Sequence, residues 1–358
     1  MNQMHIAVDG LFYTQRLSGM QRNALELLAE LDKLVAPGEV EAVVPQNLPE
    51  GCTLPAYRAI RLVRWGNHTG MRWEQLEYPR YLKKSGRMGL CLCNVIPLRG
   101  FRGVAAVLDI CYKARPDFYT TARDRLSAAW HCLQYRAIVR KARKIITLTA
   151  FSKAELMAAY HVPAERIVCI PSGWQHMERI APDETVFDRW PELKPGSYYF
   201  SMANLLKNKN FPWVLRAARN KPDALFAIAG GGSLARAAGE LGLADLPNVR
   251  YLGYVTDGQA RALMAHCKAF LFPTLYEGFG IPPMEAIACG APRVLVSDTP
   301  CMREVYRDNA DFIDLSRNTG SVDDTRPGHD PQAVLARYSW AASAQKLEAL
   351  LRQESKTV

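Results

Sequence analysis

The sequence of 358 residues lacks features that define whole classes of protein. No apolar run approaches the roughly 18 to 20 residues that a membrane-spanning helix needs, so no such helix is expected. The first residues lack a basic segment followed by a long apolar stretch, and no secretory signal peptide is predicted. No pattern recurs with a period of roughly 20 to 50 residues, which excludes solenoids.

Metal-binding signatures are equally scarce. Cys91 and Cys93 form one C-x-C pair with no second pair at zinc spacing, so partly buried thiols are expected there. The chain has nine cysteines, an odd number, and several lie in apolar segments. This pattern favours reduced thiols and a cytoplasmic protein.

The charge is distributed unevenly. The net charge is +10, and residues 1–172 hold 24 Lys and Arg against 14 Asp and Glu, whereas residues 173–358 hold 21 of each kind. A basic half suits nucleic acid, an anionic membrane or an anionic substrate. Because no nucleic-acid-binding motif accompanies the charge, we favour a membrane surface or a diphosphate-linked acceptor and expect no nucleic acid. A basic surface without a partner is the alternative.

Short apolar runs alternate with helical stretches in both halves of the chain. This alternation predicts an α/β protein with two parallel sheets covered by helices. The expected domains are residues 1–172, residues 173–336, and a C-terminal helix at 337–358 that packs back towards the first domain. A Pro-rich polar segment, 181–194, is predicted to be a linker, and Ser152 with Glu155 is predicted to form a helix capping box.

The segment 273–292, PTLYEGFGIPPMEAIACGAP, predicts a strand, a glycine loop and a helix. The apolar run at 269–272 is the strand, and the two prolines suit a helix start. Glu277 is expected before the loop and Glu285 in the first helical turn. Backbone N–H groups at such a helix start favour a phosphate, and the two carboxylates can accept hydrogen bonds from hydroxyl groups. A nucleotide sugar combines both kinds of group.

Other candidate residues follow predicted strands or open helices. Lys209 could reach a diphosphate, although a lysine in a solvated loop is the simpler interpretation. Gly19 would let a phosphate approach the first helix. Gly230–Gly232 have no side chains and would let a ligand or another segment come close to the backbone. Backbone groups near Val255 could contact a base.

The order IPSG, NKN, AGGG, YLGYV and FLFPTLYEGFGIPPMEAIACGAP resembles the retaining glycosyltransferases of family GT4. The first half contributes Asp9, Ser18-Gly19, Trp73-Glu74-Gln75, Leu108-Asp109 and the segment 149–152. The resemblance implies the GT-B fold, two Rossmann-like domains facing a central cleft. Residues 1–172 would be the acceptor-side domain and residues 173–336 the nucleotide-sugar-binding domain. It also implies transfer of a hexose or deoxyhexose from a UDP-, GDP- or dTDP-sugar to a saccharide or lipid-linked saccharide. Such a protein would work in bacterial surface polysaccharide synthesis, in the cytoplasm or at the inner face of the plasma membrane.

The resemblance also implies roles for matching residues. Glu277 would contact the donor sugar, Lys209 would neutralise the diphosphate, and Asp109 would be the third catalytic residue. The remaining donor contacts would come from Gly19, Asn204, Val255, Phe279, Gly280, Ile281 and Glu285. No cofactor or metal is implied, and the chain contains no Asp-x-Asp motif.

Two positions depart from the family pattern. Leu108 stands where the family often has a histidine, and Ala203 or Asn204 stands where it has a phosphate-binding arginine. These differences suggest a donor that lacks a hydroxyl, such as a deoxyhexose. They also motivate an alternative, a non-catalytic partner subunit that binds a nucleotide sugar.

Overall fold

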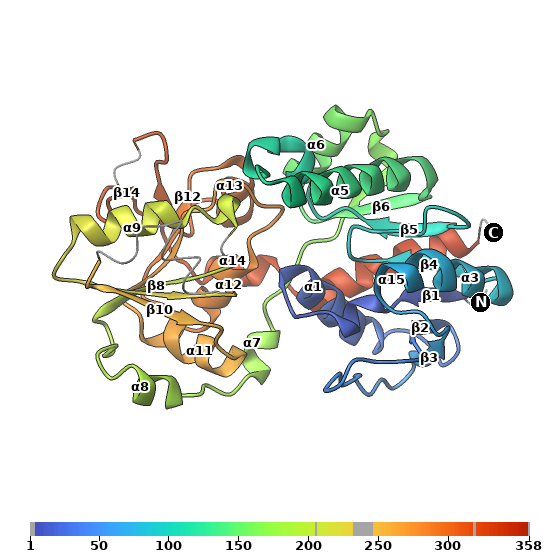
Figure 1. Ribbon diagram of the computed structural model, residues 1–358, viewed down its shortest axis with the longest axis horizontal. Coiled ribbons are helices and arrows are strands. Elements are labelled where there is room, and N and C mark those ends of the chain that lie inside the picture. The colour runs from blue at the N-terminus through green and yellow to red at the C-terminus, as the bar shows by residue number, and fades with distance from the viewer. Residues whose placement is uncertain (1–3, 205, 232–245, 318–319, 357–358) are drawn as a thin grey trace. The chain divides into compact units, whose positions relative to one another are not determined.

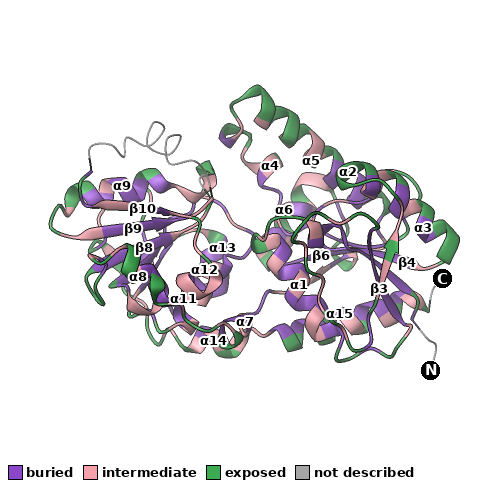
Figure 2. Ribbon diagram, turned by 60° about the horizontal axis from the view of Figure 1, so that its bottom comes forward, coloured by how far each residue is buried: buried purple, intermediate pink, exposed green. Residues whose placement is uncertain are grey.

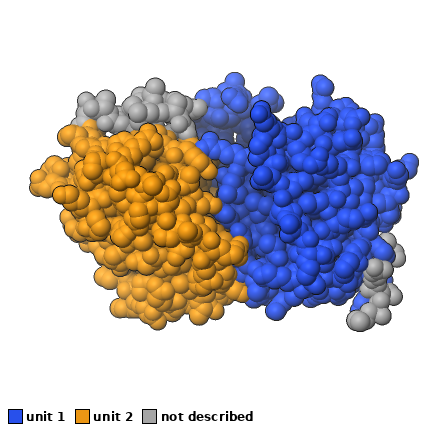
Figure 3. All heavy atoms as spheres, turned by 90° about the horizontal axis from the view of Figure 1, so that it is seen from below, with its two compact units in different colours: residues 1–172, 340–358 blue, residues 173–339 orange. Residues whose placement is uncertain are grey.

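The chain divides into two units that each contain one sheet. The computed structural model describes residues 4–204, 206–231, 246–317 and 320–356. Unit 1 comprises residues 1–172 and 340–358, and unit 2 comprises residues 173–339 (Figure 3). Among the described residues, no helix combines the length and the apolar character needed to cross a membrane.

Unit 1 is built on a seven-stranded sheet in which every strand pairs in parallel with its neighbours. The order is β3-β2-β1-β4-β5-β6-β7 (Figure 1). The strands are β1 Ile6–Asp9, β2 Val40–Pro45, β3 Arg61–Trp65, β4 Met88–Cys91, β5 Gly103–Ala106, β6 Lys144–Thr147 and β7 Ile167–Cys169. Most of these strands are buried apolar runs without polar alternation, as expected for a sheet covered on both faces.

The helices of unit 1 follow the strands in the expected alternation. They are α1 Gly19–Leu31, α2 Gly70–Arg72, α3 Tyr78–Ser85, α4 Cys111–Ala114, α5 Ala122–Lys141, α6 Ala150–Tyr160 and α15 Trp340–Ser355. The predicted capping role of Ser152 is wrong. The side chain of Thr149 caps α6 and accepts a hydrogen bond from the backbone N–H of Ser152 at 3.1 Å.

The C-terminal helix α15 lies beside α1 within unit 1 (Figure 1). The hydroxyl of Ser343 donates to the carbonyl of Pro171 at 2.6 Å. The guanidinium of Arg352 pairs with Glu39, with a shortest distance of 2.9 Å. These contacts connect the last helix to the strand region of the first unit.

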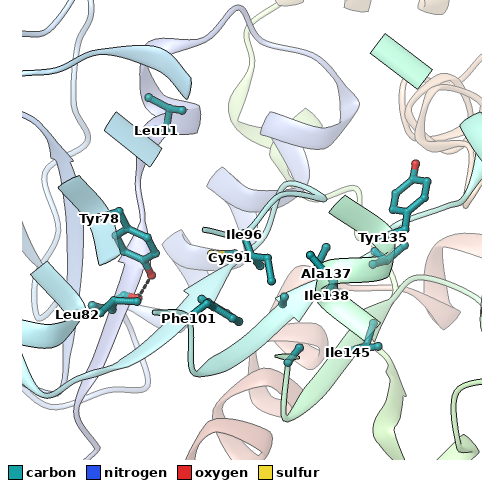
Figure 4. Close-up of a cluster of buried hydrophobic side chains, with 14 of the residues drawn as sticks. Leu11, Tyr78, Leu82, Cys91, Ile96, Phe101, Tyr135, Ala137, Ile138 and Ile145 are labelled. Atoms are coloured by element: carbon teal, nitrogen blue, oxygen red, sulfur yellow. Dashed lines mark hydrogen bonds between the residues drawn. The ribbon is translucent and has the colours of Figure 1, made fainter. Parts of the chain in front are cut away.

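The core of unit 1 combines aromatic and branched side chains from β-strands, α3 and α5. Figure 4 shows part of this cluster, including Tyr78, Tyr135 and Ile138, which are fully buried. The hydroxyl of Tyr78 donates to the carbonyl of Ala7 at 2.6 Å, so its polar end is satisfied inside the core. Helix α5, by contrast, buries only Gln134, Tyr135, Ala137 and Ile138 and exposes much of its remaining surface (Figure 2).

Unit 2 repeats the same strand order. Its sheet runs β10-β9-β8-β11-β12-β13-β14, and the first six of these strands are parallel. The strands are β8 Tyr198–Met202, β9 Leu225–Ala229, β10 Val249–Gly253, β11 Ala269–Phe272, β12 Val294–Ser297, β13 Asp311–Ile313 and β14 Thr325–Arg326. The edge strand β14 is antiparallel and was not predicted, since two residues carry no periodic signal.

The helices of unit 2 complete the second α/β layer structure. They are α7 His176–Arg179, α8 Thr185–Arg189, α9 Phe211–Asn220, α11 Asp257–His266, α12 Ile281–Ala288, α13 Pro300–Tyr306 and α14 Ala333–Arg337. The prediction that 181–194 is only a linker is wrong, because this segment contains α8 and buries Val186 and Leu193. The prediction of two parallel-sheet α/β domains is confirmed.

Candidate active site

The sheet of unit 2 places two loops next to each other at its centre. Strands β8 and β11 are neighbours, and the strand order reverses between them. Parallel sheets bind ligands beyond the carboxyl ends of their strands at such a reversal. The loop after β8 carries Lys209 and the loop after β11 carries Glu277, so both predicted residues lie at this position.

Hydrogen bonds from backbone and side-chain groups join these two loops. The N–H of Leu275 donates to the carbonyl of Asn208 at 2.7 Å, and the side-chain amide of Asn208 donates to the carbonyl of Tyr276 at 3.2 Å. The turn Lys207–Lys209 is therefore held against the segment that carries Glu277. Because the two loops are hydrogen-bonded to each other, the side chains of Lys209 and Glu277 are held in defined positions.

Lys209 and Glu277 form an ion pair. The Nζ atom of Lys209 lies 2.5 Å from Oε1 of Glu277, and the side chains are only 18% and 12% exposed. The hydroxyl of Thr274 lies 2.8 Å from the same carboxylate oxygen. The ammonium group also lies 5.6 Å from the centre of the Phe272 ring. Sequence reasoning did not identify Thr274, whose contact depends on the bend of the loop.

The loop between β11 and α12 requires its second glycine. Gly280 adopts the left-handed conformation, with φ 81° and ψ 70°. A Cβ atom there would lie 2.7 Å from Cε of Met302, and the carbonyl of Gly280 accepts a hydrogen bond from the Tyr306 hydroxyl. The left-handed conformation therefore favours glycine before α12, and a Cβ atom there would also displace the end of the Met302 side chain.

Phe279 and Ile281 are buried through their side chains. The Phe279 ring is 2% exposed and lies edge-on to Tyr338 at 5.2 Å. Only the backbone of Phe279, Gly280 and Ile281 is left for contacts at the start of α12, as the predicted role requires. Helix α12 begins at Ile281, and the prolines at positions 282 and 283 have no N–H. The N–H groups of Gly280 and Ile281 are therefore the ones that this helix start leaves without a partner inside the helix.

Glu285 lies deeper in α12 than predicted. It is the fifth residue of a helix that begins at Ile281, so the expectation that it lies in the first turn is wrong. Its Oε1 atom is 2.8 Å from Nε2 of His176, whose side chain is 1% exposed. His176 opens α7, and sequence reasoning missed it because nothing local connects residue 176 with residue 285.

The other predicted donor residues occupy strand ends of unit 2. Asn204 is exposed after β8, and Val255 is half-buried after β10. Gly230 has a structural explanation, because a Cβ atom there would lie 1.7 Å from the carbonyl oxygen of Ala203. The close backbone approach at Gly230 is therefore to Ala203. Gly232 and Leu205 lie outside the described residues.

Two predicted site residues belong to unit 1, and their roles remain predictions. Gly19 is the first residue of α1, and a Cβ atom there would meet no atom within 4 Å. Packing in the described chain therefore does not explain this glycine. Asp109 follows β5, and its Oδ1 atom accepts a hydrogen bond from the N–H of Cys111 at 2.8 Å. Leu108 is 6% exposed.

Two Rossmann-like units with the same strand order define the class to which this protein belongs, the GT-B α/β proteins. Solved GT-B structures superpose on nearly the whole chain. A sucrose-phosphate synthase from Thermosynechococcus elongatus has a TM-score of 0.72 with 16% identity over 100% of both chains. The Anabaena protein HepE, solved with UDP-glucose, has a TM-score of 0.68 with 13% identity, covering 97% of this chain and 99% of its own.

Residues 183–357 match the family model described as "Glycosyl transferases group 1". The chain is 26% identical over 237 residues to the O-antigen chain mannosyltransferase B of Escherichia coli, covering 60% of this chain and 57% of the relative. It is 24% identical over 256 residues to the GDP-mannose:cellobiosyl-diphosphopolyprenol alpha-mannosyltransferase of Komagataeibacter xylinus, covering 66% and 63%. The matches thus span about half to two thirds of these two relatives.

Proposed function

We propose that this protein is a retaining glycosyltransferase that moves a hexose or deoxyhexose from a nucleoside-diphosphate sugar to a lipid-linked saccharide. The observation that carries the proposal is the Lys209–Glu277 pair at the strand-order reversal, beside the start of α12. The names of the two relatives make mannose and GDP-mannose the first choice of sugar and donor. UDP- and dTDP-sugars are the alternatives.

In this proposal each polar group of unit 2 has one task. The N–H groups at the start of α12 and the Lys209 ammonium bind the diphosphate, because both present positive charge to it. Glu277 accepts hydrogen bonds from the sugar hydroxyls. Glu285, held by His176, accepts hydrogen bonds from the ribose, and the backbone near Val255 contacts the base.

The chemistry requires the diphosphate to leave. The bond between the anomeric carbon and the diphosphate oxygen breaks, and its electron pair stays on the diphosphate. The acceptor hydroxyl oxygen bonds to the anomeric carbon on the same face, and its proton passes to the departing diphosphate. Leu108 has no group that could take this proton. Fixed positive charge beside the developing diphosphate charge would supply most of the acceleration, in a metal-independent reaction.

The proposal is tested by incubating the purified protein with GDP-, UDP- and dTDP-sugars and measuring slow donor hydrolysis. We expect one donor to be hydrolysed, and we expect Glu277→Gln to reduce the rate strongly. Glu184→Gln is a matched control, because Glu184 forms an exposed ion pair with His266 in the same unit. Absence of both binding and hydrolysis with every donor would overturn the proposal.

The same experiment separates the enzyme from a non-catalytic partner subunit. The buried, apolar Leu108 is the observation that favours the second function. Tight binding of one nucleotide sugar without hydrolysis, and without transfer to octyl glycosides as acceptors, would favour the partner subunit. Hydrolysis that disappears in Glu277→Gln would favour the enzyme.

We also propose that α5 binds unit 1 to an anionic membrane surface. The membrane would be the plasma membrane, at its cytoplasmic face, and the protein would act there in bacterial polysaccharide synthesis. The helix carries Arg123, Arg125, Arg136, Arg140 and Lys141, and it exposes Leu126 and Leu133 by 75% and 44%. Basic and exposed apolar side chains on one helix suit the anionic headgroups and the acyl boundary of a bilayer.

A further inference from the structure

Helix α12, at the proposed donor site of unit 2, begins differently from five other helices of this chain. In α1, α5, α6, α11 and α13, the carbonyl of the residue before the helix accepts a hydrogen bond directly from the N–H four residues later, at 2.8 to 3.0 Å. In α12 the hydroxyl of Tyr306 stands between these two groups. It donates to the carbonyl of Gly280 and accepts from the N–H of Met284, and a hydroxyl can do both at once.

The hydroxyl of Tyr306 is held at a fixed point next to the start of α12. Tyr306 is the last residue of α13 and is fully buried. Its carbonyl accepts a hydrogen bond from the N–H of Asn309 at 2.7 Å, which fixes its backbone. Burial raises the pKa of Tyr306 well above its ordinary value, so the phenol keeps its proton and remains a hydrogen-bond donor.

The packing of α13 against α12 does not by itself require this hydroxyl. A phenylalanine at position 306 has the same ring, and it would leave the carbonyl of Gly280 and the N–H of Met284 free to bond to each other, as in the five other helices. A buried hydroxyl, by contrast, must find hydrogen-bond partners or cost free energy. Tyr306 therefore constrains the backbone at Gly280 in a way that an apolar side chain would not.

The hydrogen bond from Tyr306 sets the orientation of one peptide group. The carbonyl of Gly280 and the N–H of Ile281 belong to the same trans peptide, so they point in opposite directions. Because the carbonyl is directed at the buried hydroxyl, the N–H of Ile281 is directed away from it and out of the first turn of α12. Tyr306 therefore acts on this N–H through the plane of the peptide.

This one peptide matters because α12 offers few N–H groups at its start. A helix normally leaves four N–H groups without partners there. Pro282 and Pro283 have no N–H, so only the groups of Gly280 and Ile281 are left. A change in the orientation of the peptide between Gly280 and Ile281 would therefore remove half of the groups that could bind an anion.

A second residue of α13 supports the same peptide. Met302 is fully buried and lies four residues before Tyr306, on the same face of α13. A Cβ atom on Gly280 would lie 2.7 Å from Cε of Met302 and 3.4 Å from the Phe272 ring, so the glycine packs against both side chains. The Lys209 ammonium lies 5.6 Å from the centre of the same ring. The oriented peptide is thus part of the site that contains Lys209.

We infer that Tyr306 is a positioning residue of the proposed donor site, whose hydroxyl orients the N–H of Ile281 towards the diphosphate of the donor. Because it is fully buried, Tyr306 acts through the peptide and not by contact with the donor. The N–H group contributes most when negative charge develops on the departing diphosphate. This inference rests on the proposed function and adds a residue that positions its anion-binding group.

The test compares the binding of nucleoside diphosphates and of the corresponding nucleosides by calorimetry. The probes are GDP, UDP and dTDP with guanosine, uridine and thymidine. Tyr306→Phe should bind the best of the diphosphates about tenfold more weakly, the effect of losing one hydrogen bond to a charged group. It should bind the matching nucleoside as the parent protein does, because only the contact with the phosphates changes. A purely structural role for Tyr306 would weaken both ligands alike.

Tyr198→Phe is the matched control. Tyr198 is also fully buried in unit 2, and its hydroxyl donates to the carbonyl of Leu263 in α11 at 2.8 Å. The control loses the same chemical group but leaves the start of α12 unchanged, so it should bind both probes as the parent does. Met302→Leu is a second variant, which keeps the side-chain volume but is too short to place a methyl group against Gly280. It should show the same selective loss, several-fold in size.

Two results would overturn the inference. One is Tyr306→Phe with the diphosphate and nucleoside affinities of the parent, or with an equal loss of both. The other is a loss of diphosphate binding in Tyr198→Phe that matches the loss in Tyr306→Phe. If Tyr306→Phe does not fold, Met302→Leu decides by the same criteria.

Donor hydrolysis by the parent protein is measured on the same preparation, so that the two proposals can fail separately. Its absence would count against the proposed function. Hydrolysis by the parent, together with unchanged diphosphate binding in the variants, would count against the role of Tyr306 alone. A parent protein that binds none of the three diphosphates would overturn both.

Discussion

Replacing Asp9 by asparagine should stabilise unit 1 at alkaline pH. The structural reason is that Asp9 must be charged above its pKa while buried against the carboxyl of Glu74. Asparagine has nearly the same shape and keeps an oxygen that can accept from the N–H of Leu11. The substitution therefore removes the charge while leaving most contacts in place.

The size of the effect follows from the shift in pKa. Folding raises the pKa of Asp9 from 3.8 to about 7, and each pKa unit corresponds to about 1.4 kcal/mol. Below about pH 4 both the folded and the unfolded chain are protonated, and the penalty is absent. As the pH rises to about 7, the unfolded chain loses its proton first, so the free energy of unfolding falls. The upper bound is about 4.5 kcal/mol, and we expect about 1 to 3 kcal/mol in Asp9→Asn.

The other titratable groups that face Asp9 do not change the direction in which the free energy of unfolding depends on pH. Glu74 is the second member of the pair, and burial together with the charge of Asp9 raises its pKa well above the ordinary value. The thiols of Cys91 and Cys93 and the phenol of Tyr78 have pKa values that burial raises well above their ordinary ones, so they stay neutral. The pH dependence between about pH 4 and pH 8 therefore belongs to the pair.

Hydrogen exchange can report on unit 1 separately from unit 2. The protection of amides in β1 and β4 is compared between Asp9→Asn and the parent protein at about pH 5 and pH 8, each pair at the same pH. Amides in β11 serve as the internal reference, and Asp117→Asn is the control, because Asp117 is an exposed member of an ion pair in the same unit. The reasoning is refuted if the difference between variant and parent is the same at both pH values, or if the variant is less protected at pH 8.

Three further predictions concern the donor site and α5. Lys209→Ala should lower the rate of donor hydrolysis by about 30- to 1,000-fold, since one such contact contributes about 2 to 4 kcal/mol. Lys207→Ala is the control and should keep the parent rate. An unchanged rate in Lys209→Ala would show that Lys209 is only a surface residue. His176→Ala should weaken nucleoside diphosphate binding several-fold by calorimetry, because Glu285 loses its partner, and equal affinity would argue against that role. Vesicles with anionic lipid should bind the protein in a salt-sensitive manner, more weakly after Leu126→Asp; equal sedimentation with neutral vesicles would contradict this.

The predicted elements agree with the structure where a local pattern was strong. The apolar run at 269–272 is a strand with these bounds, since a buried parallel strand is a continuous apolar segment. The predictions of helix starts were wrong, because a helix start depends on one or two residues and not on a repeated pattern. Thr149 caps α6 in place of Ser152, and α12 starts at Ile281, ahead of the position that would put Glu285 in its first turn.

The amino-acid sequence by itself determined the alternation of strands and helices, the resemblance to a family of glycosyltransferases and the identity of the loop around Glu277, because these depend on residues close together in the chain. Only the tertiary structure decided which loops meet. The pairs Lys209–Glu277, His176–Glu285 and Asp9–Glu74 join residues far apart in sequence, and strand order brings the first of these pairs together. Burial, which shifts the pKa of Asp9, likewise arises only when a complete unit packs around the carboxyl group.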